Sequence, residues 1–284
     1  MGPERGTLFD RVAEDYDRVR LDYPAALVDR ACSIAGLRPG SRVVEIGCGT
    51  GKLTAALAER ELQVEAVDPG VQMIDVARRR VGSSADVRFR IGRFEDVELS
   101  PGTFAAAFSA TAFHWVDPSV GWAKVARLLQ PGGVFGLLTH VGFSPLDEQL
   151  HAVWTDVRPQ SLEWVPRDRQ TFFEGIESRL GNVSEAWAWL NQRDALAREE
   201  VASLFTDARL TTVAADEQET AEHLVAVTRT TSMYLGLGAS DRQRLEKGLA
   251  AVVDGAGGSF PLTIHGVLIT ARAVVRRASR ARAG

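Results

Sequence analysis

The sequence predicts an α/β protein built on a doubly wound, mostly parallel sheet of seven strands. Three features of the chain lead to this prediction. Short apolar runs alternate with segments of helical periodicity up to about residue 140, a glycine-rich turn follows the first run, and two more strand-like runs lie near the C-terminus. Alternating strands and helices favour parallel strands joined by right-handed crossovers, as in Rossmann-like folds.

The boundaries of the elements follow from local patterns. Strands are expected at Val43–Ile46, Val64–Val67, Val87–Ile91, Ala105–Ser109 and Val134–Leu138, the last after a turn at Gly132 and Gly133. Helices are expected at Ala25–Ile34, Lys52–Glu59, Val71–Val81 and Gly121–Leu129. We place two further strands, Leu210–Val213 and Leu262–Ala273, beside the sheet as an antiparallel pair.

The chain is expected to divide into four parts. Residues 1–142 form the ligand-binding core with its N-terminal helices, and residues 201–275 form the C-terminal part of that core. Residues 143–200 form a helical insertion over the ligand-binding edge of the sheet, because four of the six tryptophans lie between residues 154 and 189. Residues 276–284 form a basic tail.

Composition argues against several classes of protein. The 284 residues are 45% hydrophobic and 25% charged, with a net charge of −4, so nothing favours nucleic acid or an anionic membrane as partner. No apolar stretch reaches the roughly 20 residues that a membrane span needs, and the N-terminus is charged where a signal peptide would be apolar. Cys32 and Cys48 make neither a disulfide framework nor a zinc site. We therefore expect a cytoplasmic protein, whose oligomeric state the sequence does not reveal.

The glycine-rich turn VVEIGCGTGKLT, residues 43–54, is the strongest local signal. A dinucleotide site needs a third glycine at position 52, which is Lys52 here, and a P-loop needs a first glycine at position 46, which is Ile46. Glu45 lies two residues before the first glycine, where its charge would repel a phosphate and suit a cation. The turn is therefore expected to hold an adenosine-like ligand with a positive centre.

This stretch resembles the first motif of the class I S-adenosylmethionine (SAM)-dependent methyltransferases. The resemblance covers residues 8–140 and is closest to small-molecule enzymes of the methyltransferase type 11 and trans-aconitate methyltransferase kinds. It implies SAM as cofactor and S-adenosylhomocysteine (SAH) as product. It also implies that Glu45, Gly47, Cys48 and Gly49 line the methionine end of the ligand, with glycines letting the backbone approach it.

The resemblance extends to the second and third strands. Asp68 ends the second strand, 21 residues after Gly47, where a carboxylate can accept hydrogen bonds from both ribose hydroxyls. Met73 matches an apolar residue that packs on adenine. Phe94 and Glu95 are expected to contact adenine, although Arg93 stands where many relatives carry an aspartate.

Further contacts are implied by the fourth strand and the N-terminal segment. Ser109 should end its strand near the methionine moiety, although Ala105 replaces the usual aspartate of this motif. Tyr16 and Arg20 are four residues apart, hence on one helix face, and are expected to approach the methionine carboxylate.

The chemistry expected is an in-line displacement, in which the protein mainly orients the reactants. His114 is the candidate general base and cofactor contact, and His140 is a second candidate because both follow strands at the ligand edge. Trp115, His140 and Trp164 are expected to line the acceptor. We expect no metal ion.

The acceptor is expected to be a small, partly apolar molecule, in the biosynthesis of a secondary metabolite. The N-P-P-[YF] motif of nucleic-acid amino-methyltransferases is absent, and a paired-glutamate loop of protein arginine methyltransferases is not evident. Two alternatives stay open: a SAM-binding regulator that does not methylate, and a nicotinamide-dependent oxidoreductase on a similar sheet.

Overall fold

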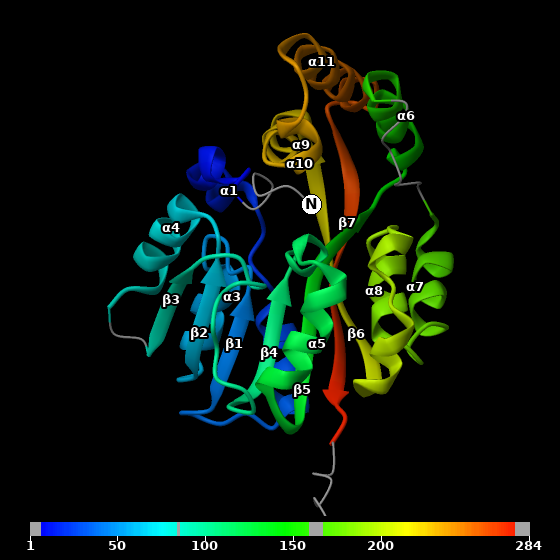
Figure 1. Ribbon diagram of the computed structural model, residues 1–284. Helices are drawn as coiled ribbons and strands as arrows, with labels where there is room; N and C mark the ends of the chain where they lie inside the picture. Colours follow the sequence, from blue (N-terminus) through cyan, green and yellow to red (C-terminus); the bar gives the residue numbers. More distant parts are fainter. Residues whose placement is uncertain (1–6, 84–85, 159–166, 276–284) are drawn as a thin grey trace, which may run out of the picture.

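The computed structural model describes residues 7–83, 86–158 and 167–275. Its centre is a seven-stranded sheet in the order β3-β2-β1-β4-β5-β7-β6 (Figure 1). The strands are β1 (Arg42–Ile46), β2 (Gln63–Asp68), β3 (Val87–Ile91), β4 (Phe104–Ala110), β5 (Leu129–Phe143), β6 (Phe205–Thr220) and β7 (Ser259–Ala273). Only β7 runs antiparallel to its neighbours, β5 and β6. The predicted mostly parallel sheet of seven strands is therefore confirmed.

Helices cover both faces of the sheet. The N-terminal half contributes α1 (Ala13–Val19), α2 (Ala25–Ala35), α3 (Lys52–Ala58), α4 (Val71–Val81) and α5 (Pro118–Leu128). The rest are α6 (Asp147–Val157), α7 (Arg169–Glu177), α8 (Val183–Leu190), α9 (Ala221–Arg229), α10 (Ser232–Leu235) and α11 (Ala239–Gly255). One face packs on α2 and α3 through a buried cluster that includes Leu27, Leu53 and Leu57. The other packs on α5, α7 and α8 through Trp122, Phe172 and Trp187.

Several helices begin at a residue whose side chain satisfies an unpaired backbone N–H. Asp117 accepts from the Ser119 N–H at the start of α5, where Pro118 takes the first helical position. Thr220 does the same for His223 N–H at the start of α9. These caps fix the first turn of α5 and of α9, whereas the N-cap residues of α2, α3 and α4 form no side-chain cap.

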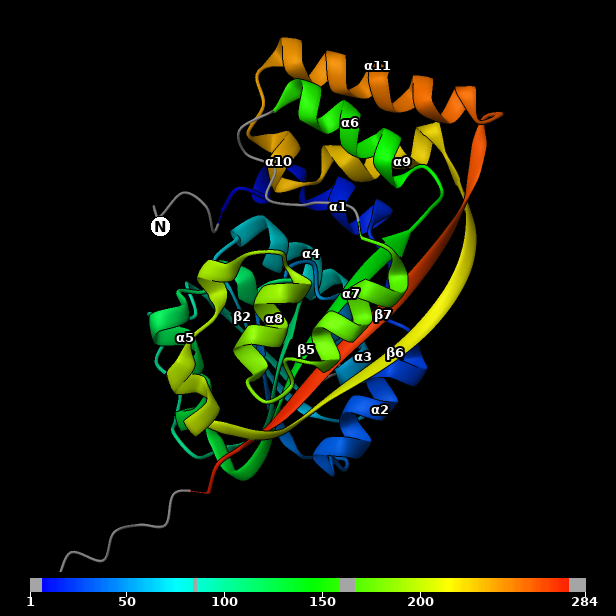
Figure 2. The same cartoon turned by 90° about the vertical axis from the view of Figure 1, so that its right-hand side faces the viewer.

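The three C-terminal strands are much longer than predicted. Residues 129–143, 205–220 and 259–273 are each one strand, and β6 and β7 rise beyond the others as a curved ribbon (Figure 2). Gly132, at φ 75°, lies inside β5 at an irregularity rather than before its start. Most of β6 is exposed, so the strand lacks the apolar alternation by which strands are recognised.

The described part of the aromatic insertion covers the ligand edge less than predicted. Helices α7 and α8 lie against the face of the sheet, where Trp187 is 1% exposed and belongs to the main core. Among the described segments of residues 143–200, only α6 stands above the carboxyl ends of the strands, packed on α11 (Figure 2). Helices α7 and α8 do not form the expected cover because large aromatic side chains serve a buried core as readily as a ligand cover.

A separate small core lies above that edge. Tyr234, Leu237, Leu245 and Leu249 form a buried cluster, against which side chains of α6 and α9 pack. Of the helices described, none combines the length and the apolarity needed to cross a bilayer.

Candidate functional site

A cavity of about 450 Å³ opens where the parallel strands end. Its walls come from the carboxyl ends of β1, β2, β4 and β5, from α1, and from residues 219–232 and 262–264. In open α/β sheets this edge is where ligands bind. No described residue between 143 and 200 lines the cavity, so its cover is α1 together with α9 and α10.

The glycine-rich turn has a shape that only glycine permits. Gly47, Gly49 and Gly51 have φ of 70°, 53° and 81°. A Cβ on Gly47 would lie 2.4 Å from the Cβ of Ala112, and a Cβ on Gly51 would lie 2.8 Å from that of Ala77. Strand ends and helix therefore pack directly on a bare backbone, which leaves the cavity floor open to a ligand.

Glu45 is a buried carboxylate without a cation. Its side chain is 1% exposed, and Oε2 accepts a hydrogen bond of 2.6 Å from the Thr54 hydroxyl. Burial raises the pKa of Glu45 to about 8; the Thr54 bond opposes this rise, and the nearby Asp68 carboxylate adds to it. None of the ion pairs between described residues includes Glu45. A buried carboxylate is stable in its ionised form only when a cation or further hydrogen-bond donors pair with it.

Asp68, the last residue of β2, stabilises the conformation of the glycine-rich turn through hydrogen bonds. Its two oxygens accept hydrogen bonds of 2.9 Å from Gly49 N–H and 2.8 Å from Gly70 N–H. Burial raises the pKa of Asp68 to about 6, against the effect of those two bonds. Each carboxylate oxygen keeps a second lone pair, so the side chain can still accept ribose hydroxyls, as the sequence suggested.

Arg20 and Tyr16 lie together over the cavity. The Arg20 guanidinium stands 5.1 Å from the centre of the Tyr16 ring, and its Nε donates to the Thr230 hydroxyl at 2.9 Å. Among described residues Arg20 takes part in no ion pair, which leaves the rest of its planar fork available for a carboxylate. Burial raises the pKa of the Tyr16 phenol.

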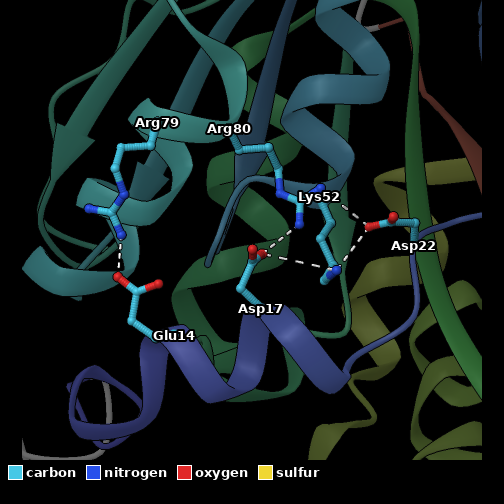
Figure 3. Close-up of polar contacts among 6 residues, drawn as sticks. All are labelled: Glu14, Asp17, Asp22, Lys52, Arg79 and Arg80. Atoms are coloured by element: carbon cyan, nitrogen blue, oxygen red, sulfur yellow. Dashed lines mark hydrogen bonds and ion pairs between the residues drawn. The ribbon is translucent and has the colours of Figure 1, made fainter.

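Ion pairs hold this N-terminal segment over the cavity (Figure 3). Asp17 on α1 lies 2.7 Å from Arg80 and 4.0 Å from Lys52, and Asp22 lies 2.9 Å from Lys52. A further pair joins Glu14 to Arg79. These ion pairs hold the segment against α3 and α4. Helix α3 begins directly after the glycine-rich turn, and α4 begins shortly after Asp68.

The predicted adenine contacts all border the cavity. Met73 is 5% exposed and packs with Phe9 and Tyr16, and Phe94 is 3% exposed. Glu95 Oε1 accepts both the Asp117 N–H and an Arg93 N–H at 2.9 Å. The Glu95 carboxylate is therefore already engaged.

Two predicted histidines also border the cavity. His114 has a buried Nδ1 without a hydrogen-bond partner, and burial lowers its pKa to about 4, with Arg193 adding to the effect. His140 stacks on Tyr23 with ring centres 4.8 Å apart, and burial lowers its pKa to about 4 as well. The imidazoles of His114 and His140 are consequently neutral near neutral pH.

The predicted acceptor residue Trp115 also lines the cavity, beside Phe9, with 5.9 Å between the ring centres.

One predicted residue is not at the cavity, and the position of another is not described. Ser109 is 0% exposed and donates its hydroxyl to the Ile46 carbonyl at 2.7 Å, so it links β4 to β1 within the sheet and does not border the cavity. The predicted cofactor contact of Ser109 is corrected accordingly. Trp164 lies outside the described residues.

Several residues that line the cavity carry no site signal in the sequence. Thr50 in the glycine turn is 2% exposed, and its hydroxyl has no hydrogen-bond partner among the described residues, which suits a polar ligand. Glu219, His223 and Val227 come from the end of β6 and from α9, which chain topology brings back over the sheet. No local motif marks such residues, because only the long ribbon places them here.

The site fits one kind of ligand by charge and shape. Four polar side chains line the cavity: the buried carboxylate of Glu45, the guanidinium of Arg20, the hydroxyl of Thr50 and the carboxylate of Asp68. These groups suit an adenosine derivative that carries both a cation and a carboxylate. Across the described ranges, no three metal-ligating side chains cluster in a way that could hold an ion.

Comparison with known proteins agrees with this geometry. A family model described as a methyltransferase domain matches residues 43–133. An uncharacterized methyltransferase of Mycobacterium tuberculosis is 40% identical over 123 residues, 43% of this chain and 48% of that protein. A ubiquinone biosynthesis O-methyltransferase of Xanthomonas campestris is 38% identical over 124 residues, 43% of this chain and 48% of that protein. The chain thus spans about half the length of the curated relatives it matches.

Solved structures show the same fold. A putative type II methyltransferase from Anaeromyxobacter dehalogenans has a TM-score of 0.56 at 21% identity, over 90% of this chain and 99% of that one. A putative methyltransferase from an antibiotic biosynthesis pathway of Anabaena variabilis has a TM-score of 0.51 at 18% identity, over 84% and 96%.

Proposed function

Because the chain carries a class I SAM-dependent methyltransferase domain, we propose that it transfers a methyl group from SAM to a small-molecule acceptor. The observation that supports this most directly is that Glu45 and Arg20 line the same cavity and that neither takes part in an ion pair among the described residues. SAM carries cationic groups and a carboxylate, so one ligand would neutralise both side chains. Asp68 would accept the ribose hydroxyls, and Met73 with Phe94 would hold the adenine.

The protein's part in the reaction is orientation and exclusion of water. When bound, SAM supplies a methyl group already activated on a sulfonium sulfur. Arg20 and Asp68 fix the two ends of the donor, which turns an encounter in solution into a reaction between held groups. Phe9, Trp115 and Tyr16 cover the site, and a dry site favours a reaction in which charge is lost.

The lining of the cavity beyond the cofactor residues supports a small acceptor. Val227, Leu262 and Ile264 add apolar wall beyond the cofactor residues, within a cavity of about 450 Å³. We expect neither nucleic acid nor a membrane as partner, and a place in the cytoplasm. The ubiquinone O-methyltransferase relatives favour a ring-bearing oxygen acceptor, whether in primary or in the predicted secondary metabolism.

The test uses SAM labelled on the methyl group with carbon-14. The purified protein is incubated with labelled SAM and a cell extract separated into small molecules, nucleic acid and protein. We expect label in organic-soluble small molecules only, and little with Arg20→Ala. Binding of SAM without transfer to any fraction would favour the non-methylating alternative instead.

A further inference from the structure

Beyond the cofactor residues, the cavity holds a paired acid and histidine. His223 Nδ1 lies 2.9 Å from both Oε1 and Oε2 of Glu219. Glu219 is 8% exposed, and its Oε1 also accepts the Thr220 N–H at 2.8 Å. Both side chains line the cavity. The carboxylate is thus fixed, and it fixes the ring in turn.

This contact determines the tautomer of His223. An ionised carboxylate can only accept hydrogen bonds, so Nδ1 must carry the proton. The lone pair of a neutral ring is then on Nε2, for which no partner is found among the described groups. A base held in one tautomer by a buried acid is the arrangement used in many proton transfers.

The other cavity histidines lack this support. Neither His114 nor His140 contacts a carboxylate side chain in the hydrogen bonds found between described residues, and burial lowers the pKa of both to about 4. A general base works best when its pKa lies near the operating pH. Both are therefore weak bases, and His223, with 44% of its side chain exposed, can also return a proton to solvent.

The position of His223 leaves room for an acceptor. His223 lies in the first turn of α9, and Thr230, whose hydroxyl accepts a hydrogen bond from Arg20, follows the last residue of that helix. Seven residues of helix span about 10 Å. Val227 lies between these two points, facing the same cavity as Leu262 and Ile264. An apolar acceptor in this space would have the cofactor end of the cavity on one side and the imidazole on the other.

We propose that His223, oriented by Glu219, is the general base for an acceptor with a phenol- or enol-type hydroxyl. This rests on the proposed methyltransferase function. The O–H bond of the acceptor breaks as its proton passes to Nε2. The oxygen's electron pair forms the bond to the methyl carbon, and the carbon–sulfur bond breaks with its pair left on sulfur. A neutral imidazole and a cationic donor become an imidazolium and a neutral thioether, so charge balances.

The acceptor class follows from the base and from the walls. An imidazole removes a proton far more readily from a phenol or an enol than from an aliphatic alcohol. The surrounding Val227, Leu262 and Ile264 suit an apolar ring. Other charged side chains near α9 are Glu222, next to His223 in the chain, and Arg20, which follows α1. Arg229 of α9 forms an ion pair with Glu246 of α11.

The kinetic test compares His223→Gln with His151→Gln, a histidine that does not border the cavity. The probes are phenol, 4-methylphenol, 4-nitrophenol and a 2-hydroxy-1,4-quinone, with SAH formation as the assay. For phenol we expect His223→Gln to lower kcat by about 10²-fold or more, and His151→Gln to leave it unchanged. The loss should be far smaller for 4-nitrophenol, which is largely ionised without a base.

Two measurements do not depend on turnover. SAH should bind His223→Gln and wild type with equal affinity in calorimetry. Histidine side-chain NMR of the SAH-bound protein should show the neutral ring of His223 protonated at Nδ1, and Glu219→Gln should reduce that preference.

Each outcome bears on one claim. Full activity of His223→Gln on phenol, or protonation at Nε2 in wild type, would overturn the assignment of the base. SAH binding without methylation of any probe by wild type would contradict the hydroxyl class. Failure of wild type to bind SAH would instead refute the proposed function itself.

Discussion

The surroundings of Glu45 indicate the charge of the ligand group that its side chain would contact. A carboxylate that is 1% exposed and has one neutral hydrogen bond should exist largely protonated. The raised pKa of Glu45, about 8, reflects the free-energy cost of burying its ionised form. A cationic ligand offsets this cost, because it stabilises the ionised form.

Binding of SAM should therefore release a proton from Glu45. At pH 7 the free protein holds that proton, and the cationic ligand lowers the pKa, so about one proton leaves per SAM bound. Titration calorimetry in buffers of different ionisation enthalpy measures this release. Glu45→Gln should abolish it, and equal heats in all buffers for wild type would contradict it.

The same carboxylates should make the free protein less stable as pH rises. The pKa of Glu45 is raised from 4.5 to about 8, and that of Asp68 from 3.8 to about 6. The folded state then holds more protons than the unfolded state in these windows, so the free energy of unfolding falls between about pH 4 and pH 8. Urea unfolding at several pH values checks this. A stability that rises steadily over the window would show that neither carboxylate behaves as the structure implies.

At the scale of elements, α1 is the least independent part of the site. It has only seven residues, too few to persist alone in water. Ala13 and Tyr16 pack on Met73 and Val76, and the ion pairs of Figure 3 add to this contact. A cover held by partly exposed ion pairs can open to admit a ligand at modest cost.

Asp17→Asn should loosen this cover without unfolding the protein. The change removes the carboxylate that Arg80 and Lys52 share. Pairs of this kind contribute up to about 1 kcal/mol, so SAH affinity should fall up to about fivefold and depend less on salt. Asp15→Asn is the control, because Asp15 pairs only with Arg18 on the same helix among the pairs described. Equal affinities for the two variants, measured by calorimetry at two salt concentrations, would refute the role of Asp17.

At the scale of the whole molecule, two separate hydrophobic cores support the walls of the cavity. The sheet and its flanking helices build the cofactor half of the cavity, and the small cluster around Leu245 supports the roof. The two are linked mainly by the β6–β7 ribbon and by β5 (Figure 2). This division predicts that the roof can loosen while the sheet stays folded.

Leu245→Ala should test that division. Leu245 is 0% exposed, and its truncation should cost about 2–5 kcal/mol of local stability. Hydrogen exchange should rise in α6, α9 and α11, with little change in β1 and α3. The matched variant Leu57→Ala, also 0% exposed but under the sheet, should raise exchange in the sheet instead. Identical exchange patterns for the two variants would mean that the molecule unfolds as one unit.

The parts of the molecule that could be predicted are those set by local pattern. The apolar runs before Gly47 and Asp68 identify buried strands, and the glycine turn places a ligand between them. By contrast, the acidic end of β6 around Asp216 is exposed and carries no strand signal. The sequence around His223 carries no site signal, because its partner Glu219 lies in a strand rather than on the same helix. The contacts that depend on the fold of the ribbon could not be read from neighbouring residues.

The central claim is that the cavity accepts an adenosine ligand carrying both a cation and a carboxylate. Titration calorimetry with SAH, alongside NADH and ATP, tests it most directly. We predict binding of one SAH per chain, with negligible heat from either phosphate-bearing nucleotide, since the Asp68 carboxylate repels phosphate and a phosphate gives Glu45 no cation to pair with. Tight binding of NADH or ATP together with no binding of SAH would contradict the account.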